Sequence, residues 1–297
     1  MRPELLAKIH GIELAVVGRV EGLLQGDHRG LLPGPGGEPG DARPYVPGDD
    51  VRRIDWNVTA RSTRTHVRDT TADRELETTL VFDMSASMEF GSGADTKADV
   101  ALGAGGVFGF LTDKAGDRVG AVIAGKRTLA IPARTGRSHV YGILARASAP
   151  DVAGGVADLA AGIHRVARLK TRRGLVVVVS DFLGAADWVR PMRALAGRHD
   201  VVAVEVFDPR EETLVNAGSV RLVDPETGRA AWIDTGSASV RRRFADLAKE
   251  RRRTLAREFS TLSVTHIPLS TGGDWGADVV AAVLGRRRRM ASTGRSA

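Results

Sequence analysis

The amino-acid sequence predicts a mixed α/β protein built on a doubly wound, mostly parallel sheet. From residue 77 onward, short runs rich in β-branched residues alternate with longer segments that have helical spacing. One run, residues 175–179, is aliphatic throughout, which is typical of a strand covered on both faces. Strands separated by helices are joined by right-handed crossovers, so we expect helices on both faces of the sheet.

The first 76 residues predict a separate, smaller unit. Residues 4–25 have apolar side chains spaced along one face of a helix, and residues 30–40 form a loop rich in glycine and proline. Residues 43–76 predict short strands and turns, with the sharpest turn at 47–50. The predicted divisions are an N-terminal helix and β/loop unit over 1–76, an α/β domain over 77–285, and a basic, disordered tail over 286–297.

The elements of the larger domain follow from apolar spacing and from turn residues. The predicted strands cover residues 78–82, 119–124, 128–131, 175–179, 200–207 and 262–267, with a separate hairpin at 220–223 and 230–233. The predicted helices cover residues 95–111, 138–148, 158–169, 187–197, 239–259 and 275–285. Pro132 places the strand before it at a sheet edge, because proline cannot donate a hydrogen bond to a neighbouring strand.

The composition excludes several functional classes. The chain of 297 residues has 42% hydrophobic residues and no cysteine, so it can bury a core but has no disulfide framework, cysteine nucleophile or thiolate zinc site. The longest purely aliphatic run, residues 175–179, is far shorter than a membrane span, and residues 1–8 lack the apolar core of a signal peptide. We therefore expect a cytoplasmic protein without a membrane span.

The formal net charge of +7 makes nucleic-acid binding an alternative to be weighed. The arginines gather in runs at 241–243, 251–253 and 286–289. The few aromatic residues do not alternate with these runs, so the sequence offers no stacking platform for a single strand. Solvated helix faces and a basic tail are the interpretation that we prefer.

Polar side chains gather where two predicted strands end. Asp83 follows the strand at 78–82, and Asp181 follows the strand at 175–179, so both are expected at the carboxyl rim where doubly wound sheets bind ligands. Ser85 and Ser87 alternate after Asp83, so that a turn directs one carboxylate and two hydroxyls to a single point. The alternative is that these side chains only hydrogen-bond the backbone of their own turns.

Carboxylate and hydroxyl oxygens are ligands that suit Mg²⁺, or Mn²⁺ as a substitute, with several waters retained. Hydroxyl ligands are neutral, so the ion keeps much of its positive charge and accepts a carboxylate from another protein. The sequence therefore predicts a magnesium site formed by Asp83, Ser85, Ser87 and Asp181.

Two sets of motifs carry a family resemblance. The string Asp83-Met-Ser-Ala-Ser87 resembles the metal-ion-dependent adhesion site (MIDAS) of von Willebrand factor A-type domains. The segment 43–56, which contains Pro-Gly-Asp-Asp and Ile-Asp-Trp, resembles the signature of the domain-of-unknown-function-58 family. Further similar segments lie at 59–61, 74–77, 179–182, 198–202, 208–210 and 274–275, so the resemblance covers residues 20–285.

This resemblance implies a sheet of von Willebrand factor A type in a bacterial protein that is often encoded beside a MoxR-type AAA+ ATPase. It also implies a chaperone-like role with that ATPase in the maturation of other proteins. A full adhesion site has a threonine from a second loop, but residues 154–159 offer only Asp158 as an oxygen side chain. Asp158 is either a replacement ligand or the N-cap of the next helix, and the missing threonine predicts weak metal binding.

The preferred function is a metal-dependent protein-interaction module that acts as partner of a MoxR-type ATPase and is not itself an enzyme. A Mg²⁺-dependent hydrolase, such as a phosphatase, is the alternative, because an aspartate after the first strand also serves phosphoryl transfer. Such an enzyme needs a second acid two residues later, where this chain has Ser85, and a placed lysine, whereas Lys97 and Lys170 lie in or beside helices. Nucleic-acid binding through the arginine runs is a second alternative.

Overall fold

The computed structural model describes residues 3, 6–7, 9–11, 42–46, 54–62, 64–68, 77–114, 116–169 and 173–293. Near the N-terminus, β1 (Ala42–Pro44) pairs antiparallel with β2 (His66–Arg68), and the short helix α2 (Trp56–Thr59) lies between them in sequence. The predicted turn at 47–50, and most of the predicted helix over 4–25, lie outside the described residues.

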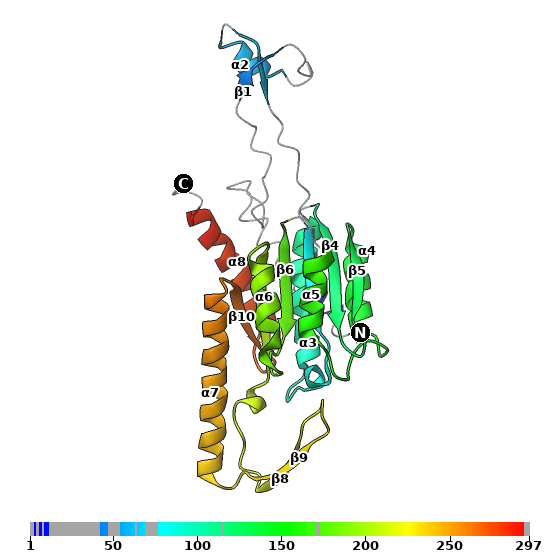
Figure 1. Ribbon diagram of the computed structural model, residues 1–297, viewed down its shortest axis with the longest axis vertical. Helices are drawn as coiled ribbons and strands as arrows, with labels where there is room; N and C mark the ends of the chain where they lie inside the picture. The colour runs from blue at the N-terminus through cyan, green and yellow to red at the C-terminus, as the bar shows by residue number, and fades with distance from the viewer. Residues whose placement is uncertain are drawn as a thin grey trace.

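From residue 77 the chain alternates between strands and helices, as predicted (Figure 1). The strands are β3 (Glu77–Asp83), β4 (Arg118–Ala124), β5 (Leu129–Arg134), β6 (Leu175–Ser180), β7 (Asp200–Phe207), β8 (Ser219–Val223), β9 (Ala230–Asp234) and β10 (Thr265–Ser270). The α-helices are α3 (Lys97–Lys114), α4 (Arg137–Ala147), α5 (Leu159–Leu169), α6 (Val189–Ala196), α7 (Ala238–Thr261) and α8 (Trp275–Thr293). The described residues also include the short 3₁₀ turns η2 (Ala86–Glu89), η3 (Ala186–Trp188) and η4 (Pro209–Glu211).

Six strands form one sheet in the order β10-β7-β6-β3-β4-β5. Every neighbouring pair is parallel except β4 and β5, which form an antiparallel hairpin at one edge. Pro132 lies in this edge strand, as predicted. The first strand of the sheet, β3, lies between β6 and β4, so the strand order reverses beside it. The predicted doubly wound, mostly parallel sheet is confirmed.

Helices cover both faces of the sheet and produce two separate cores. On one face, α3, α4 and α8 pack on side chains such as Leu80, Phe82 and Val177. On the other face, α5, α6 and α7 pack on side chains such as Val81, Val176 and Val178. Alternate residues of one strand thus serve opposite cores, which is why β6 is apolar throughout and buried at every position.

The glycines of α3 allow this helix to lie very close to its neighbours. A Cβ atom at Gly103 would collide with the indole of Trp275, and one at Gly105 would collide with the ring of Phe82. These glycines lie inside the helix rather than at a strand-to-helix turn, so they serve close packing and not phosphate binding.

Several boundaries differ from the predictions, and two of these differences have a clear physical cause. The last strand begins at Thr265 rather than at 262, because Leu262 still caps α7 and Ser263 then turns the chain with a positive φ of 56°. The last helix, α8, continues to Thr293, whereas the sequence predicted a disordered tail from 286. Arginine, alanine and methionine are all good helix formers, and the prediction of a disordered tail overlooked that preference.

Candidate metal centre

The two predicted carboxylates lie at the same rim of the sheet. Asp83 is the last residue of β3, and Asp181 directly follows β6. These strands are parallel neighbours with Phe82 opposite Val179, so their carboxyl ends coincide. Asp83 is 6% exposed and Asp181 is 3% exposed, so both carboxylates are buried.

Hydrogen bonds join the four predicted ligands into one cluster. The Ser87 hydroxyl donates to Asp181 Oδ2 at 2.7 Å, and the Ser85 and Ser87 hydroxyl oxygens lie 3.1 Å apart. Asp83 Oδ1 accepts a hydrogen bond from the backbone of Ser85 at 3.0 Å, while Asp83 Oδ2 accepts one from Ser180 Oγ at 2.6 Å. The structure thus brings together Asp83, Ser85, Ser87 and Asp181, and it adds Ser180.

The loop between α4 and α5 holds the turn that carries Ser85 and Ser87. The backbone N–H of Gly154 donates to the carbonyl of Met84 at 2.8 Å, and the N–H of Ala86 donates to the carbonyl of Gly155 at 2.8 Å. Gly154 and Gly155 have φ values of 84° and 73°, in the left-handed region that glycine adopts without strain. The second loop of the predicted site therefore contributes backbone contacts to the turn.

Asp158 takes the second of its two predicted roles. Its Oδ1 atom accepts a hydrogen bond from the backbone of Ala161 at 2.7 Å, which makes it the N-cap of α5. The residue is exposed, whereas the four clustered ligands are buried. Among the described residues, no hydrogen bond joins Asp158 to the cluster. We therefore do not retain the interpretation of Asp158 as a replacement ligand.

Lys97 is a member of the site that sequence reasoning missed. It is the first residue of α3 and is 0% exposed. Its Nζ atom lies 2.7 Å from Asp181 Oδ2 and 2.5 Å from Glu211 Oε1. The available signal was its position, since the helix after the first strand of a doubly wound sheet begins at the ligand-binding rim.

The surroundings of Asp83 disfavour its charged form more than its hydrogen bonds favour that form. Burial raises the pKa of the Asp83 carboxyl above its usual value, and the nearby charge of Asp181 raises it further. Hydrogen bonds from Ser180 and Ser85 favour the charged form and oppose this increase. A cation held between the two carboxylates would remove the repulsion that raises this pKa.

The donor set fits a hard divalent ion. The clustered side chains supply two carboxylates and two hydroxyls, all oxygen donors, which suit Mg²⁺ or Mn²⁺ with water completing the coordination. No group of three or more histidine, aspartate or glutamate side chains arranged to hold a metal occurs in the part of the chain that the structure describes. An ion at this rim would therefore depend on the serine hydroxyls, as the sequence predicts.

Asp208 links three loops at the rim beside this cluster through hydrogen bonds. It is 0% exposed and follows β7. Its carboxylate accepts hydrogen bonds from the backbone and hydroxyl of Ser92 at 2.8 and 2.7 Å, from Thr271 Oγ1 at 2.5 Å, and from the backbone of Arg210 at 2.8 Å. Burial acts to raise the pKa of Asp208, but these hydrogen bonds outweigh it and the pKa lies below its usual value.

Phe182, next to Asp181, has an uncommon backbone conformation. Its φ of 49° lies in the left-handed region, which is unfavourable for an aromatic residue. Its ring packs against Trp188 and Phe259 with centroids 5.1 Å away in each case, and its backbone N–H bonds to Ser180 Oγ at 3.0 Å. The surrounding core therefore maintains a strained residue beside the candidate ligand Asp181.

A doubly wound sheet with an Asp-x-Ser-x-Ser turn at its carboxyl rim places the chain in the class of von Willebrand factor A-like α/β proteins. More specifically, the chain belongs to the family described as "Protein of unknown function DUF58", whose model matches residues 41–254. The "Uncharacterized protein Rv1480" of Mycobacterium tuberculosis is 47% identical over 289 residues, which cover 96% of this chain and 91% of that relative. The "Uncharacterized protein MAV169" of Mycobacterium avium is 42% identical over 162 residues, covering 53% of this chain and 94% of that protein.

Solved structures show more distant similarities. An aerotolerance-related membrane protein from Bacteroides fragilis is 14% identical, with a TM-score of 0.45, and covers 72% of this chain and 99% of that chain. The SpRpn10 VWA domain is 12% identical, with a TM-score of 0.41, and covers 69% of this chain and 93% of that chain. The fold assignment rests on the strand order given above. No helix in the described part of the chain combines the length and the apolar character that a bilayer crossing requires.

Proposed function

We propose that this protein is a divalent-metal-dependent protein-interaction module whose partner contributes an acidic residue to the metal. The observation that carries the proposal is the buried cluster of Asp83, Ser85, Ser87 and Asp181 at the rim where the strand order reverses. These four side chains would hold Mg²⁺ or Mn²⁺. When bound, the ion supplies a positive centre that a carboxylate from another protein can complete.

The contribution of the protein itself is to fix the oxygens before the ion arrives. Backbone hydrogen bonds from the loop at 154–155 hold the serine turn, and Ser180 orients Asp83. Burial lowers the effective dielectric constant around both carboxylates, which strengthens their attraction for a cation. A site with this arrangement needs no catalytic group of its own.

We propose a MoxR-type AAA+ ATPase as the partner, in chaperone-like maturation of other proteins. This part of the proposal rests on membership in the family and on the resemblance of the sequence motifs. Nucleotide hydrolysis would take place on the ATPase, and this chain would provide the metal-dependent contact.

The hydrolase alternative gains one feature from the structure and still lacks another. Lys97 does reach Asp181, so a lysine stands at the rim after all. Its ammonium is fully buried and already paired with Asp181 and Glu211. The second acid two residues after Asp83 remains a serine, and Ser85 cannot act as the general acid that a phosphatase of this kind uses.

The test is binding of a purified MoxR-type ATPase from the same organism to immobilised protein, in Mg²⁺ or in EDTA. We expect binding by the wild type in Mg²⁺ only, and none by Asp83→Ala in either condition. Asp158→Ala is the matched control, because it removes a carboxylate from the same rim that only caps α5. Equal capture in EDTA, or equal capture by Asp83→Ala, would overturn the proposal. Turnover of phosphate esters that Asp83→Ala stops would establish the hydrolase instead.

A further inference from the structure

Lys97 is a buried cation inside a site that is proposed to bind a cation. Its side chain is 0% exposed, and its ammonium lies between Asp181 Oδ2 at 2.7 Å and Glu211 Oε1 at 2.5 Å. A buried ammonium is stable only when it is paired, so these two carboxylates hold Lys97 in place and the lysine in turn neutralises part of their charge.

The lysine and a divalent ion would compete for the same atom. Asp181 Oδ2 already accepts hydrogen bonds from Lys97 and from Ser87, and Asp181 Oδ1 accepts one from the backbone of Leu183 at 3.1 Å. An ion that takes Asp181 Oδ2 as ligand meets the ammonium at close range. Two positive charges about 4 Å apart repel strongly when water is excluded.

We propose that the Lys97 ammonium occupies the position beside Asp181 that a divalent ion would take. The ion must displace this ammonium, and the displacement sets both the affinity of the site for the ion and the structural response of the protein to binding. This inference rests on the proposed function, because it requires that a divalent ion binds here. Lys97 thus positions the Asp181 carboxylate, and it excludes ions that bind too weakly to displace its ammonium.

The second contact of Lys97 leads away from the site. Glu211 ends η4, where its carboxylate accepts a hydrogen bond from the backbone of Asp208 at 3.2 Å and completes a capping box. Its neighbour Glu212 accepts a hydrogen bond from Arg252 of α7 at 2.8 Å. The guanidinium of Arg252 also lies 3.8 Å from the ring centroid of Phe207. A shift of Lys97 therefore acts on the segment that connects β7 with the elements beyond the rim.

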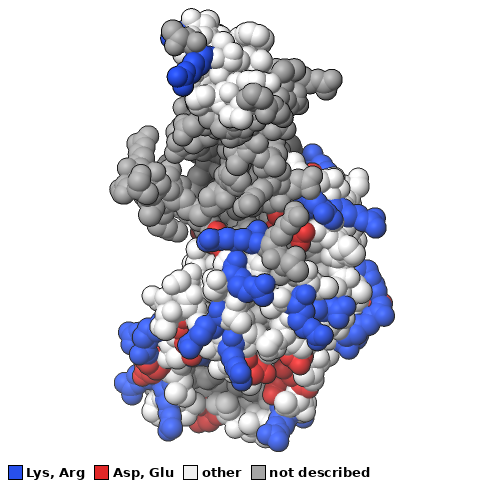
Figure 2. All heavy atoms as spheres, turned by 45° about the horizontal axis from the view of Figure 1, so that its top comes forward, with Lys and Arg blue, Asp and Glu red and all other residues white. Residues whose placement is uncertain are grey.

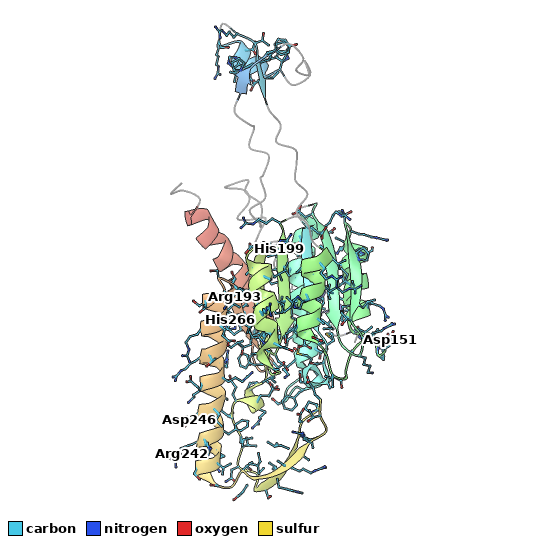
Figure 3. All side chains as sticks on the ribbon, in the orientation of Figure 1. Asp151, Arg193, His199, Arg242, Asp246 and His266 are labelled. Carbon is cyan, nitrogen blue, oxygen red and sulfur yellow. The ribbon has the colours of Figure 1, made fainter. Side chains whose placement is uncertain are left out.

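Those elements form an arm, which we define as residues 219–250, comprising β8, β9 and the first half of α7. The arm extends past the carboxyl ends of the parallel strands, where the candidate metal centre lies (Figure 1). Arg242 and Asp246 mark the part of α7 that belongs to it (Figure 3). Trp232 in β9 is 72% exposed. Displacement of Lys97 from Asp181 would loosen Glu211 and change the stability of the backbone at the base of this arm.

The test measures Mn²⁺ affinity by electron paramagnetic resonance and amide hydrogen exchange over residues 209–223, in wild type and Lys97→Met. We expect Lys97→Met to bind Mn²⁺ at least about tenfold more tightly, because the competing charge is gone. We also expect Mn²⁺ to change exchange over 209–223 in the wild type but not in Lys97→Met. Lys126→Met is the control, since Lys126 is exposed and its ammonium donates a hydrogen bond to the carbonyl of Pro150 at 2.8 Å.

The possible results separate the two proposals. Wild-type binding of Mn²⁺ that Lys97→Met leaves unchanged or weakens would overturn the inference about Lys97 while the metal-binding function stands. Absence of Mn²⁺ binding in both proteins would overturn the function and the inference together. If Lys97→Met fails to fold, the double variant Lys97→Met/Glu211→Gln removes one carboxylate with the ammonium, and the same tighter binding is expected from it.

Discussion

At the scale of single residues, the buried charge of the Asp83 carboxylate does not itself stabilise the folded protein. It is buried beside Asp181, and both the burial and the charge of Asp181 raise its pKa. A carboxylate that served only to close a turn would be satisfied by its hydrogen bonds alone. A destabilising charge kept at a rim is typical of a residue that serves binding rather than stability.

Asp83→Asn should therefore separate binding from stability. We expect the variant to lose at least about 100-fold in Mn²⁺ affinity, because the loss of a direct ligand exceeds the effect of losing an outer contact. In EDTA its melting temperature should be at least that of the wild type and up to about 2–4 °C higher, since one buried negative charge is gone. Titration calorimetry and thermal unfolding measure the two effects. A variant that melts well below the metal-free wild type would show that Asp83 is structural.

The pH dependence of this difference has a definite sign. The raised pKa means that folded Asp83 binds a proton more readily than unfolded Asp83 does. The metal-free wild type thus gains stability, relative to Asp83→Asn, as the pH falls through the folded pKa. The gain is complete below the unfolded value of about 3.9. Denaturant unfolding of both proteins across this range, in EDTA, measures it.

At the scale of elements, Asp208 connects the loops that surround the candidate site. It joins the loop after β3 through Ser92, the turn η4 through Arg210, and the loop after β10 through Thr271. These loops follow three strands that are neighbours or next neighbours in the sheet. Their mutual positions therefore depend on one carboxylate.

Asp208→Asn should destabilise the fold by about 1–3 kcal/mol, because an amide nitrogen replaces one acceptor oxygen in a fully buried network. The pKa of Asp208 is lowered, so its contribution is present above the unfolded pKa of about 3.9 and is lost as the pH falls through the folded pKa. The difference between variant and wild type should consequently shrink in acid.

Chemical denaturation at pH 7 and at pH 3 checks this prediction. Asp224→Asn is the matched control, because Asp224 also accepts several hydrogen bonds and has a lowered pKa but lies exposed in the turn between β8 and β9. A loss of stability that is equal for both variants would contradict the structural role given to Asp208.

The glycines of α3 and α4 provide an element-scale pair with opposite expected signs. Gly105→Ala would force a Cβ into the ring of Phe82, and we expect a loss of about 1–3 kcal/mol. Gly142→Ala in α4 has no atom within 4 Å of its new Cβ, so the better helix propensity of alanine should stabilise the protein by about 0.5–1 kcal/mol. Denaturant unfolding of both variants measures the signs, and a stabilising Gly105→Ala would show that α3 is not packed as described.

At the scale of the whole molecule, the sequence predicted the fold and four members of the site. The aliphatic run of β6 and the alternation from residue 77 fixed a parallel sheet, and strand ends placed Asp83 and Asp181 together. Lys97 and Glu211 were not predicted because the ion pairs of Lys97 with Asp181 and Glu211 join residues that are far apart in the sequence. Asp158 illustrates the converse, since a local cap and a distant ligand look alike in sequence and only the hydrogen bond to Ala161 decides between them.

On the face seen in Figure 2, lysine and arginine are scattered, with smaller groups of aspartate and glutamate between some of them. Several arginines of α7 are already engaged within the protein: Arg241 with the carbonyls of Thr235 and Gly236, Arg252 with Glu212, and Arg257 with Glu250. These contacts agree with the preferred interpretation of the arginine runs in α7 as solvated helix faces.

The central claim is that oxygen atoms of Asp83, Ser85, Ser87 and Asp181 hold a divalent ion at the rim of the sheet. A crystal soaked in MnCl₂ and measured at the manganese absorption edge tests it most directly. We expect an anomalous peak within coordination distance of the Asp83 carboxylate and the Ser85 and Ser87 hydroxyls, with Lys97 moved from Asp181. Absence of a peak, with Ser87 and Lys97 still bonded to Asp181 at saturating Mn²⁺, would contradict the claim.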